Sequence, residues 1–83
     1  MEEQLGISFG KAVRRLRLVA GFTQEKLGQE AGVQRNFVSS IELGQKLPSL
    51  VTIFKLASAL RVAPGKLLDL TEQELRRAWS AEL

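Results

Sequence analysis

Four polar residues share one side of a short helix that the sequence predicts from about residue 35 to residue 43. Arg35, Asn36, Ser39 and Ser40 are spaced i, i+1, i+4 and i+5, which groups their side chains on one helical face. Arginine is the commonest bidentate partner of guanine in the major groove, and asparagine pairs in the same way with adenine. The face therefore predicts hydrogen bonds to base edges, whereas the two serines alone would equally suit a merely soluble surface.

The opposite side of this helix is apolar. Val38 and Ile41 must be buried, so the polar face points outward. Arg35 lies in the first turn, where the helix dipole disfavours a positive charge, and this placement favours a functional role. Gln34 occupies the cap position and is included in the predicted DNA contacts. Lys46, in the loop that follows, is a candidate phosphate contact, although a solvated loop lysine explains it nearly as well.

A second helix precedes the first, with a turn between them. Thr23 caps a helix predicted over residues 24–31, and Gly32 supplies the left-handed residue at which the chain reverses. The apolar residues of both helices point to one shared core; they are Leu27, Ala31, Val33, Val38 and Ile41. Two helices joined in this way form a helix-turn-helix, a pattern that helical hairpins with other functions share in part.

The wider chain resembles the phage-repressor and Cro-like family, also called Xre-type regulators. The resemblance covers residues 8–70 without a gap and rests on the segments AVRRLR (12–17), GFTQEKL (21–27), AGVQRNFVSSIELG (31–44), PSL (48–50) and LASALRV (56–62). It implies an all-α, five-helix, lambda-repressor-like domain that binds palindromic operators as a homodimer. It also implies a transcriptional regulator that places its third helix in the major groove.

The resemblance also assigns roles to individual residues. Arg35, Asn36 and Ser40 match the base-reading positions, and Gln24 matches a residue that holds a phosphate at the second helix. Arg17 and Glu42 match an internal ion pair, which would cancel the repulsion between that glutamate and DNA. Three departures are Gly28 for the usual alanine, Phe37 for a frequent tyrosine and Leu43 for a common arginine. We expect the last two to remove DNA contacts and Gly28 to cost about 1 kcal/mol of helix propensity.

The remaining elements follow from the apolar periodicity. Ser8 is expected to cap a first helix that ends near Ala20, and a short fifth helix is expected to start at Pro64. The predicted fourth helix, residues 50–60, has an inward stripe of Leu50, Ile53, Phe54, Ala57 and Leu60. A capping box at Thr71 predicts one more short helix. The chain thus divides into an N-terminal segment (1–7), the DNA-binding domain (8–70) and a C-terminal helix (71–83).

Apolar residues at helical spacing continue through this last segment. They are Leu68, Leu75, Ala78, Trp79 and Leu83. One interpretation packs them onto the fifth helix as core. The other makes Leu68, Leu75 and Trp79 a dimer interface, where tryptophan is enriched.

The composition excludes several classes of site. Among 83 residues there is no cysteine, histidine or tyrosine, which removes disulfides, thiolate and imidazole metal ligands and the commonest general base. We expect no cofactor, no metal and no enzymatic activity. The start Met1-Glu2-Glu3 is acidic and lacks the apolar region of a signal peptide, and no apolar stretch suits a membrane span, so a cytoplasmic location is expected.

The charge distribution favours a polyanionic partner. The net charge is only +3, but residues 10–46 carry seven cationic side chains against three glutamates. Solvated helix faces would produce the same numbers, so charge alone does not decide. The alternative function is a protein-interaction module on the same helical bundle. Whether a partner protein controls the regulator also stays open, as does its biological context, which could be a phage, a restriction-modification system or a toxin–antitoxin pair.

Overall fold

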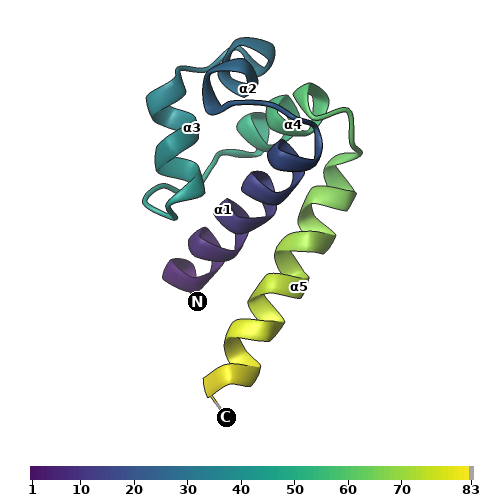
Figure 1. Ribbon diagram of the computed structural model, residues 1–83. Coiled ribbons are helices and arrows are strands. Elements are labelled where there is room, and N and C mark those ends of the chain that lie inside the picture. The colour runs from purple at the N-terminus through teal and green to yellow at the C-terminus, as the bar shows by residue number, and fades with distance from the viewer. Residues whose placement is uncertain (83) are drawn as a thin grey trace.

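The described residues form five α-helices, in the order α1 (Glu2–Val19), α2 (Gln24–Ala31), α3 (Arg35–Glu42), α4 (Leu50–Ala59) and α5 (Pro64–Glu82). The computed structural model describes the backbone of residues 1–82 and the side chains of residues 1–80, and no strand occurs within that part. The all-α, five-helix fold is confirmed. The two long helices, α1 and α5, run antiparallel side by side, so both termini lie at the same end of the molecule (Figure 1).

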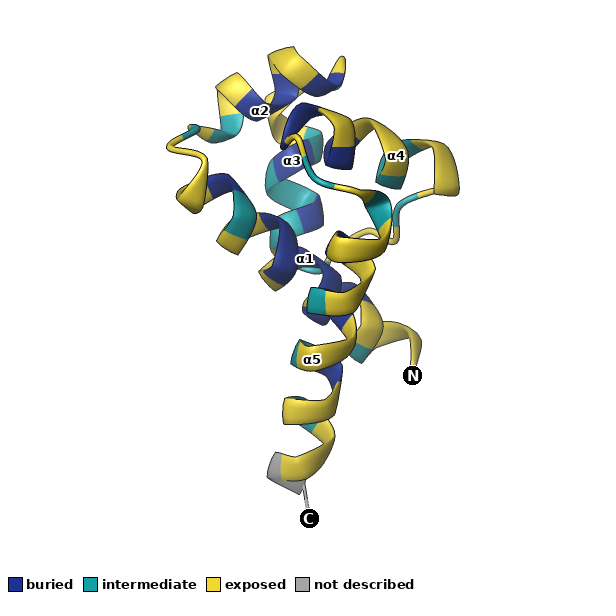
Figure 2. Cartoon of the chain, turned by 90° about the vertical axis from the view of Figure 1, so that its right-hand side faces the viewer, coloured by how far each residue is buried: buried dark blue, intermediate teal, exposed yellow. Residues whose placement is uncertain are grey.

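One apolar core joins all five helices. Its largest fully buried side chains are Val13, Leu27, Val38, Ile41, Leu56 and Leu67. Val13 comes from α1, Leu27 from α2, Val38 and Ile41 from α3, Leu56 from α4 and Leu67 from α5. Because α2 and α3 place their inward residues in this shared core, the turn between them is fixed from both sides. Burial is concentrated where α1 to α4 meet, and the C-terminal part of α5 is largely exposed (Figure 2).

The cap predicted for α2 is confirmed, and α4 begins with a cap of the same kind. The Thr23 hydroxyl accepts a hydrogen bond from the Lys26 N–H at 3.0 Å, and the Ser49 hydroxyl accepts one from the Thr52 N–H at 3.2 Å. Gly32 ends α2 with φ +72°, a conformation in which an L side chain is unfavourable. The α2–turn–α3 unit is therefore specified locally as well as by the core.

The first helix starts earlier than the sequence suggested. It begins at Glu2, not at Ser8, and Ser8 is buried in its interior instead of capping it. The residues 1–7, expected as a separate segment, thus belong mostly to α1. Gly6 lies in the added part of α1, where a Cβ would be 3.3 Å from the Gly44 carbonyl oxygen, and Gly10 lies in the predicted part, where a Cβ would be 2.7 Å from that of Glu42. Glycine, usually a helix breaker, here allows α1 to lie against the end of α3.

The separate C-terminal helix expected after Thr71 does not exist. The helix α5 continues from Pro64 through this position, and Thr71 is buried, with its hydroxyl donating to the Leu67 carbonyl oxygen at 2.8 Å. Inside a helix, a threonine hydroxyl can donate to the carbonyl oxygen four residues earlier. The same sequence pattern is therefore compatible with a continuous helix as well as with a helix start. Leu83, which the predicted apolar stripe included, lies outside the described residues.

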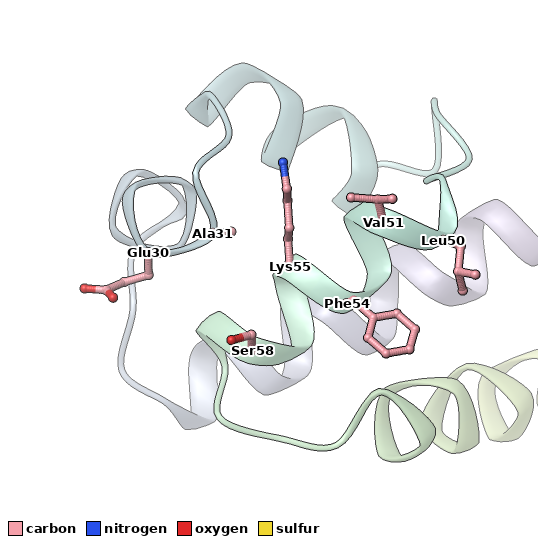
Figure 3. A pocket seen from close by; sticks show the side chains of 7 residues that line it. All are labelled: Glu30, Ala31, Leu50, Val51, Phe54, Lys55 and Ser58. Atoms are coloured by element: carbon pink, nitrogen blue, oxygen red, sulfur yellow. The ribbon is translucent and has the colours of Figure 1, made fainter.

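The predicted inward face of α4 was partly wrong. Ile53, Ala57 and Leu60 do face the core, but Leu50 is 67% exposed and Phe54 is 55% exposed, and Leu56 is fully buried. The predicted and the observed buried faces both obey helical spacing, because apolar residues occur on all sides of this helix. We call Leu50, Val51 and Phe54 the α4 patch. They project from α4 beside a hollow whose other wall includes Glu30 and Ala31 of α2 (Figure 3).

Candidate nucleic-acid interface

The polar face of α3 is exposed as the sequence predicted. Val38 and Ile41 are fully buried, whereas Arg35 and Asn36 are exposed. Ser39 and Ser40 are half-buried on the same side, with small side chains that leave room for a ligand edge. Gln34 precedes the helix in an extended conformation, is exposed, and makes no side-chain cap hydrogen bond. The structure thus brings together all the side chains assigned to base reading.

An ion pair fixes the end of this helix to α1. The Arg17 guanidinium donates from Nε to Glu42 Oε2 at 2.6 Å and from a terminal nitrogen to Oε1 at 2.9 Å. Its other terminal nitrogen donates to the Phe22 carbonyl oxygen at 2.9 Å. The side chains of Arg17 and Glu42 are only 10% and 3% exposed. The hydrogen bonds to Glu42 raise the pKa of Arg17 despite the opposing effect of burial, so the guanidinium stays charged.

The same carboxylate also contacts α2. The Gln24 side-chain nitrogen donates to Glu42 Oε1 at 3.2 Å, so Glu42 connects three helices. Gln24 follows the Thr23 cap, at the positive end of the α2 dipole. One amide hydrogen is directed to Glu42, and an amide group has a second donor. The contact orients the Gln24 amide, a relationship that the sequence reasoning missed.

Lys46 lies in the loop after α3. Its ammonium group is 5.6 Å from the centre of the Phe37 ring, within the range of a cation–π interaction. Phe37 stands where the family often has tyrosine, and the ring gives the loop lysine a defined position. Lys46 is exposed, so its charge is still available to an anion near the end of α3.

Close packing explains why a glycine occupies position 28, which helix propensity alone would disfavour. It is buried in α2, and a Cβ there would lie 2.7 Å from the Val33 carbonyl oxygen. The Val33 N–H in turn donates to the Gly28 carbonyl oxygen at 2.9 Å. Glycine therefore allows the turn to fold closely over α2, which sets where α3 begins.

A helix-turn-helix family model matches residues 13–67, two thirds of the chain and all of α2 and α3. The chain belongs to the Xre-type helix-turn-helix family. It is a DNA-binding transcriptional regulator, and the protein-interaction alternative has no support among its relatives.

Two named relatives of this helix-turn-helix regulator are controller proteins. The control protein C.BamHI of Bacillus amyloliquefaciens is 40% identical over 72 residues, which are 86% of this chain and 89% of that protein. The crystal structure of the restriction-modification controller C.AhdI from Aeromonas hydrophila superimposes with a TM-score of 0.73 at 42% identity, covering 75% of this chain and 94% of that one.

A third comparison shows the fold alone. The clp gene regulator ClgR of Corynebacterium glutamicum superimposes with a TM-score of 0.89 over 94% of this chain and 83% of its own, at 23% identity. These relatives are regulators, not enzymes. No helix within the described residues is long and apolar enough to cross a membrane.

The three residues assigned to dimerisation do not form one exposed surface. Leu75 is buried within the protomer, as the core interpretation expected, whereas Leu68 is 44% and Trp79 is 40% exposed. The α4 patch is more exposed than either of them. The sequence reasoning did not find it, because Leu50 and Phe54 were interpreted as core.

Proposed function

We propose that this regulator is a controller of the restriction-modification type, which binds a palindromic operator upstream of the genes it regulates. Two relatives support this role, since C.AhdI is named a restriction-modification controller and C.BamHI is named a control protein. The observation that carries the proposal is the exposed polar face of α3, which lies opposite the buried Val38 and Ile41. The Arg17–Glu42 pair joins the end of this helix to α1. A short helix fixed at both ends presents its side chains in one orientation to the major groove.

We assign direct readout to the first turn and centre of α3. Arg35 pairs with a guanine and Asn36 with an adenine, each through two hydrogen bonds. Ser39 and Ser40 contribute single hydrogen bonds, and Gln34 reaches the adjoining edge of the groove. Because bidentate pairs discriminate more strongly, Arg35 and Asn36 contribute most of the specificity.

We assign backbone contacts to two residues on either side of that helix. Gln24 donates its second amide hydrogen to a phosphate at the α2 N-terminus, where the helix dipole also favours an anion. Lys46 supplies a cationic contact at the far end of α3. These contacts position the domain on the duplex and add no sequence information.

We further propose that the regulator binds as a homodimer. The eight-residue helix α3 reaches only a few base pairs, so tight specific binding requires two half-sites. A chain of this size also buries a limited fraction of its surface when it folds alone. The α4 patch groups three exposed apolar side chains within five consecutive residues of one helix, which is typical of an association surface. Leu68 and Trp79 on α5 form the alternative interface.

The proposal is tested by measuring binding to the DNA upstream of the regulator's own gene in a mobility-shift titration at several salt concentrations. We expect a specific complex whose affinity falls with salt, with a log–log slope of about −0.9 for each phosphate contact. A scrambled duplex of the same composition is the control. Equal affinity for both duplexes would contradict specific recognition, and a flat salt dependence would contradict phosphate contacts.

A further inference from the structure

One apolar residue lies on the otherwise polar face of α3. Leu43 is the residue after the helix, and its side chain is 64% exposed. Its backbone keeps the right-handed helical conformation, with φ −83° and ψ −3°, and its N–H donates to the Ser39 carbonyl oxygen at 3.0 Å. Leu43 therefore extends the geometry of α3 by one residue.

The helical register places Leu43 in the middle of the reading face. It follows Asn36 by seven residues, and two turns of helix bring it back to within about 20° of the Asn36 direction. Ser39 and Ser40 lie between the two along the helix axis, one on either side of that line. The buried Val38 and Ile41 are on the opposite side, so Leu43 faces whatever Asn36 faces.

A leucine side chain offers no hydrogen bond, and leaving it in water is unfavourable compared with an apolar contact. In the major groove the apolar group on a base edge is the 5-methyl of thymine. At 1.5 Å per residue, Leu43 lies about 10 Å beyond Asn36 along the axis of α3, so the two side chains face different base pairs when this helix lies in the major groove. The surface thus offers a hydrogen-bonding end and an apolar end.

We propose that Leu43 packs against the 5-methyl group of a thymine in each half-site and is a specificity-determining residue. The inference rests on the proposed function, because it requires α3 to lie in the major groove. It differs from the expectation that replacing the usual arginine only removes a contact. Leucine in place of the usual arginine replaces a charge that attracts any DNA sequence with an apolar contact that distinguishes thymine from cytosine.

The test is a methyl-deletion scan of the operator. A duplex is selected from a random pool with the full-length regulator, and each thymine in it is then replaced in turn by uracil, which removes only the methyl group. We expect one thymine per half-site at which uracil lowers the affinity about fourfold, the effect of one buried methyl group. In Leu43→Ala the same replacement has no effect, and in Leu43→Met, which keeps an apolar side chain, most of the effect remains.

Leu18→Ala is the matched control, because Leu18 is 56% exposed on α1 and lies outside the reading face. It leaves the uracil effect unchanged. The inference is overturned if no uracil lowers the affinity, or if the effect is the same in Leu43→Ala. In either case a selected operator sequence would leave the proposed function intact. If no sequence is selected at all, both the proposed function and the role of Leu43 are wrong.

Discussion

Arg17 on α1 and Glu42 at the end of α3 form a two-point ion pair that is almost completely shielded from solvent. The pair neutralises the one carboxylate within α3, which would otherwise repel DNA. It also attaches the reading helix to the longest packed helix pair in the fold, α1 and α5. Structural rigidity and electrostatic compatibility with a polyanion therefore depend on the same two side chains.

Glu42→Ala should destabilise the fold strongly. It leaves the Arg17 guanidinium buried with only the Phe22 carbonyl as a partner, and breaking such a pair from one side costs about 3–5 kcal/mol. Urea denaturation followed by circular dichroism measures the change. The matched control is the double variant Arg17→Met with Glu42→Leu, which should recover most of the loss because two apolar side chains replace two charges. A loss below about 1 kcal/mol, typical of a surface pair, would contradict the structural role.

Gly28→Ala should lower the stability, although helix propensity predicts a gain of about 1 kcal/mol. The new Cβ would meet the Val33 carbonyl oxygen, and overpacking of this kind costs about 1–3 kcal/mol. Gly65→Ala is the control, because a Cβ there has nothing within 4 Å, and it should be neutral or slightly stabilising. Thermal melts of the two variants measure the change in stability. A higher melting temperature for Gly28→Ala would show that the turn can move without cost.

Arg61→Gly should stabilise the domain by about 1 kcal/mol. Arg61 follows α4 with φ +58°, a conformation that costs an L residue about 1–2 kcal/mol. The Val62 N–H donates to the Ala57 carbonyl oxygen across this turn, so the chain is held there in spite of the strain. Lys55→Gly within α4 should instead lose about 1 kcal/mol. If both glycines destabilise equally in chemical denaturation, the strain at Arg61 is not real.

If the α4 patch is the interface of the proposed homodimer, Phe54→Ser should shift that dimer towards monomer. Phe54 is 55% exposed within the α4 patch, so its replacement removes contact area between copies while the helical content stays. Analytical ultracentrifugation of Phe54→Ser and Trp79→Ala compares the two proposed surfaces. Dissociation by Trp79→Ala alone would place the interface on α5, and a monomeric unmodified chain would contradict dimerisation altogether.

Local signals allowed the centre of the fold to be predicted. Thr23, Gly32 and Ser49 each fix a helix boundary through their own backbone or side chain, and Val38 and Ile41 fix which side of α3 is buried. The Arg17–Glu42 contact followed from the family resemblance, and the structure contains it.

The errors arose where only tertiary contacts decide. Ser8 and Thr71 are polar residues buried inside helices, where they were interpreted as caps. Gly6 lies in the part of α1 that was not predicted, and its close approach to the Gly44 carbonyl oxygen is a contact that no local pattern records. On α4 the apolar residues surround the helix, so their spacing could not tell Leu56 from Phe54 as the buried one.

The central claim is that Arg35 reads sequence and does not support the fold. Arg35→Ala should reduce discrimination at one base pair per half-site by about 1–3 kcal/mol and leave the melting temperature unchanged, because the exposed side chain has no buried partner to lose. Lys46→Ala, the matched loss of one charge, should weaken binding to all sequences alike. The measurement is the affinity of each variant for a complete set of single-base operator changes. If base preference survives at every position in Arg35→Ala, or if that variant unfolds, the account is contradicted.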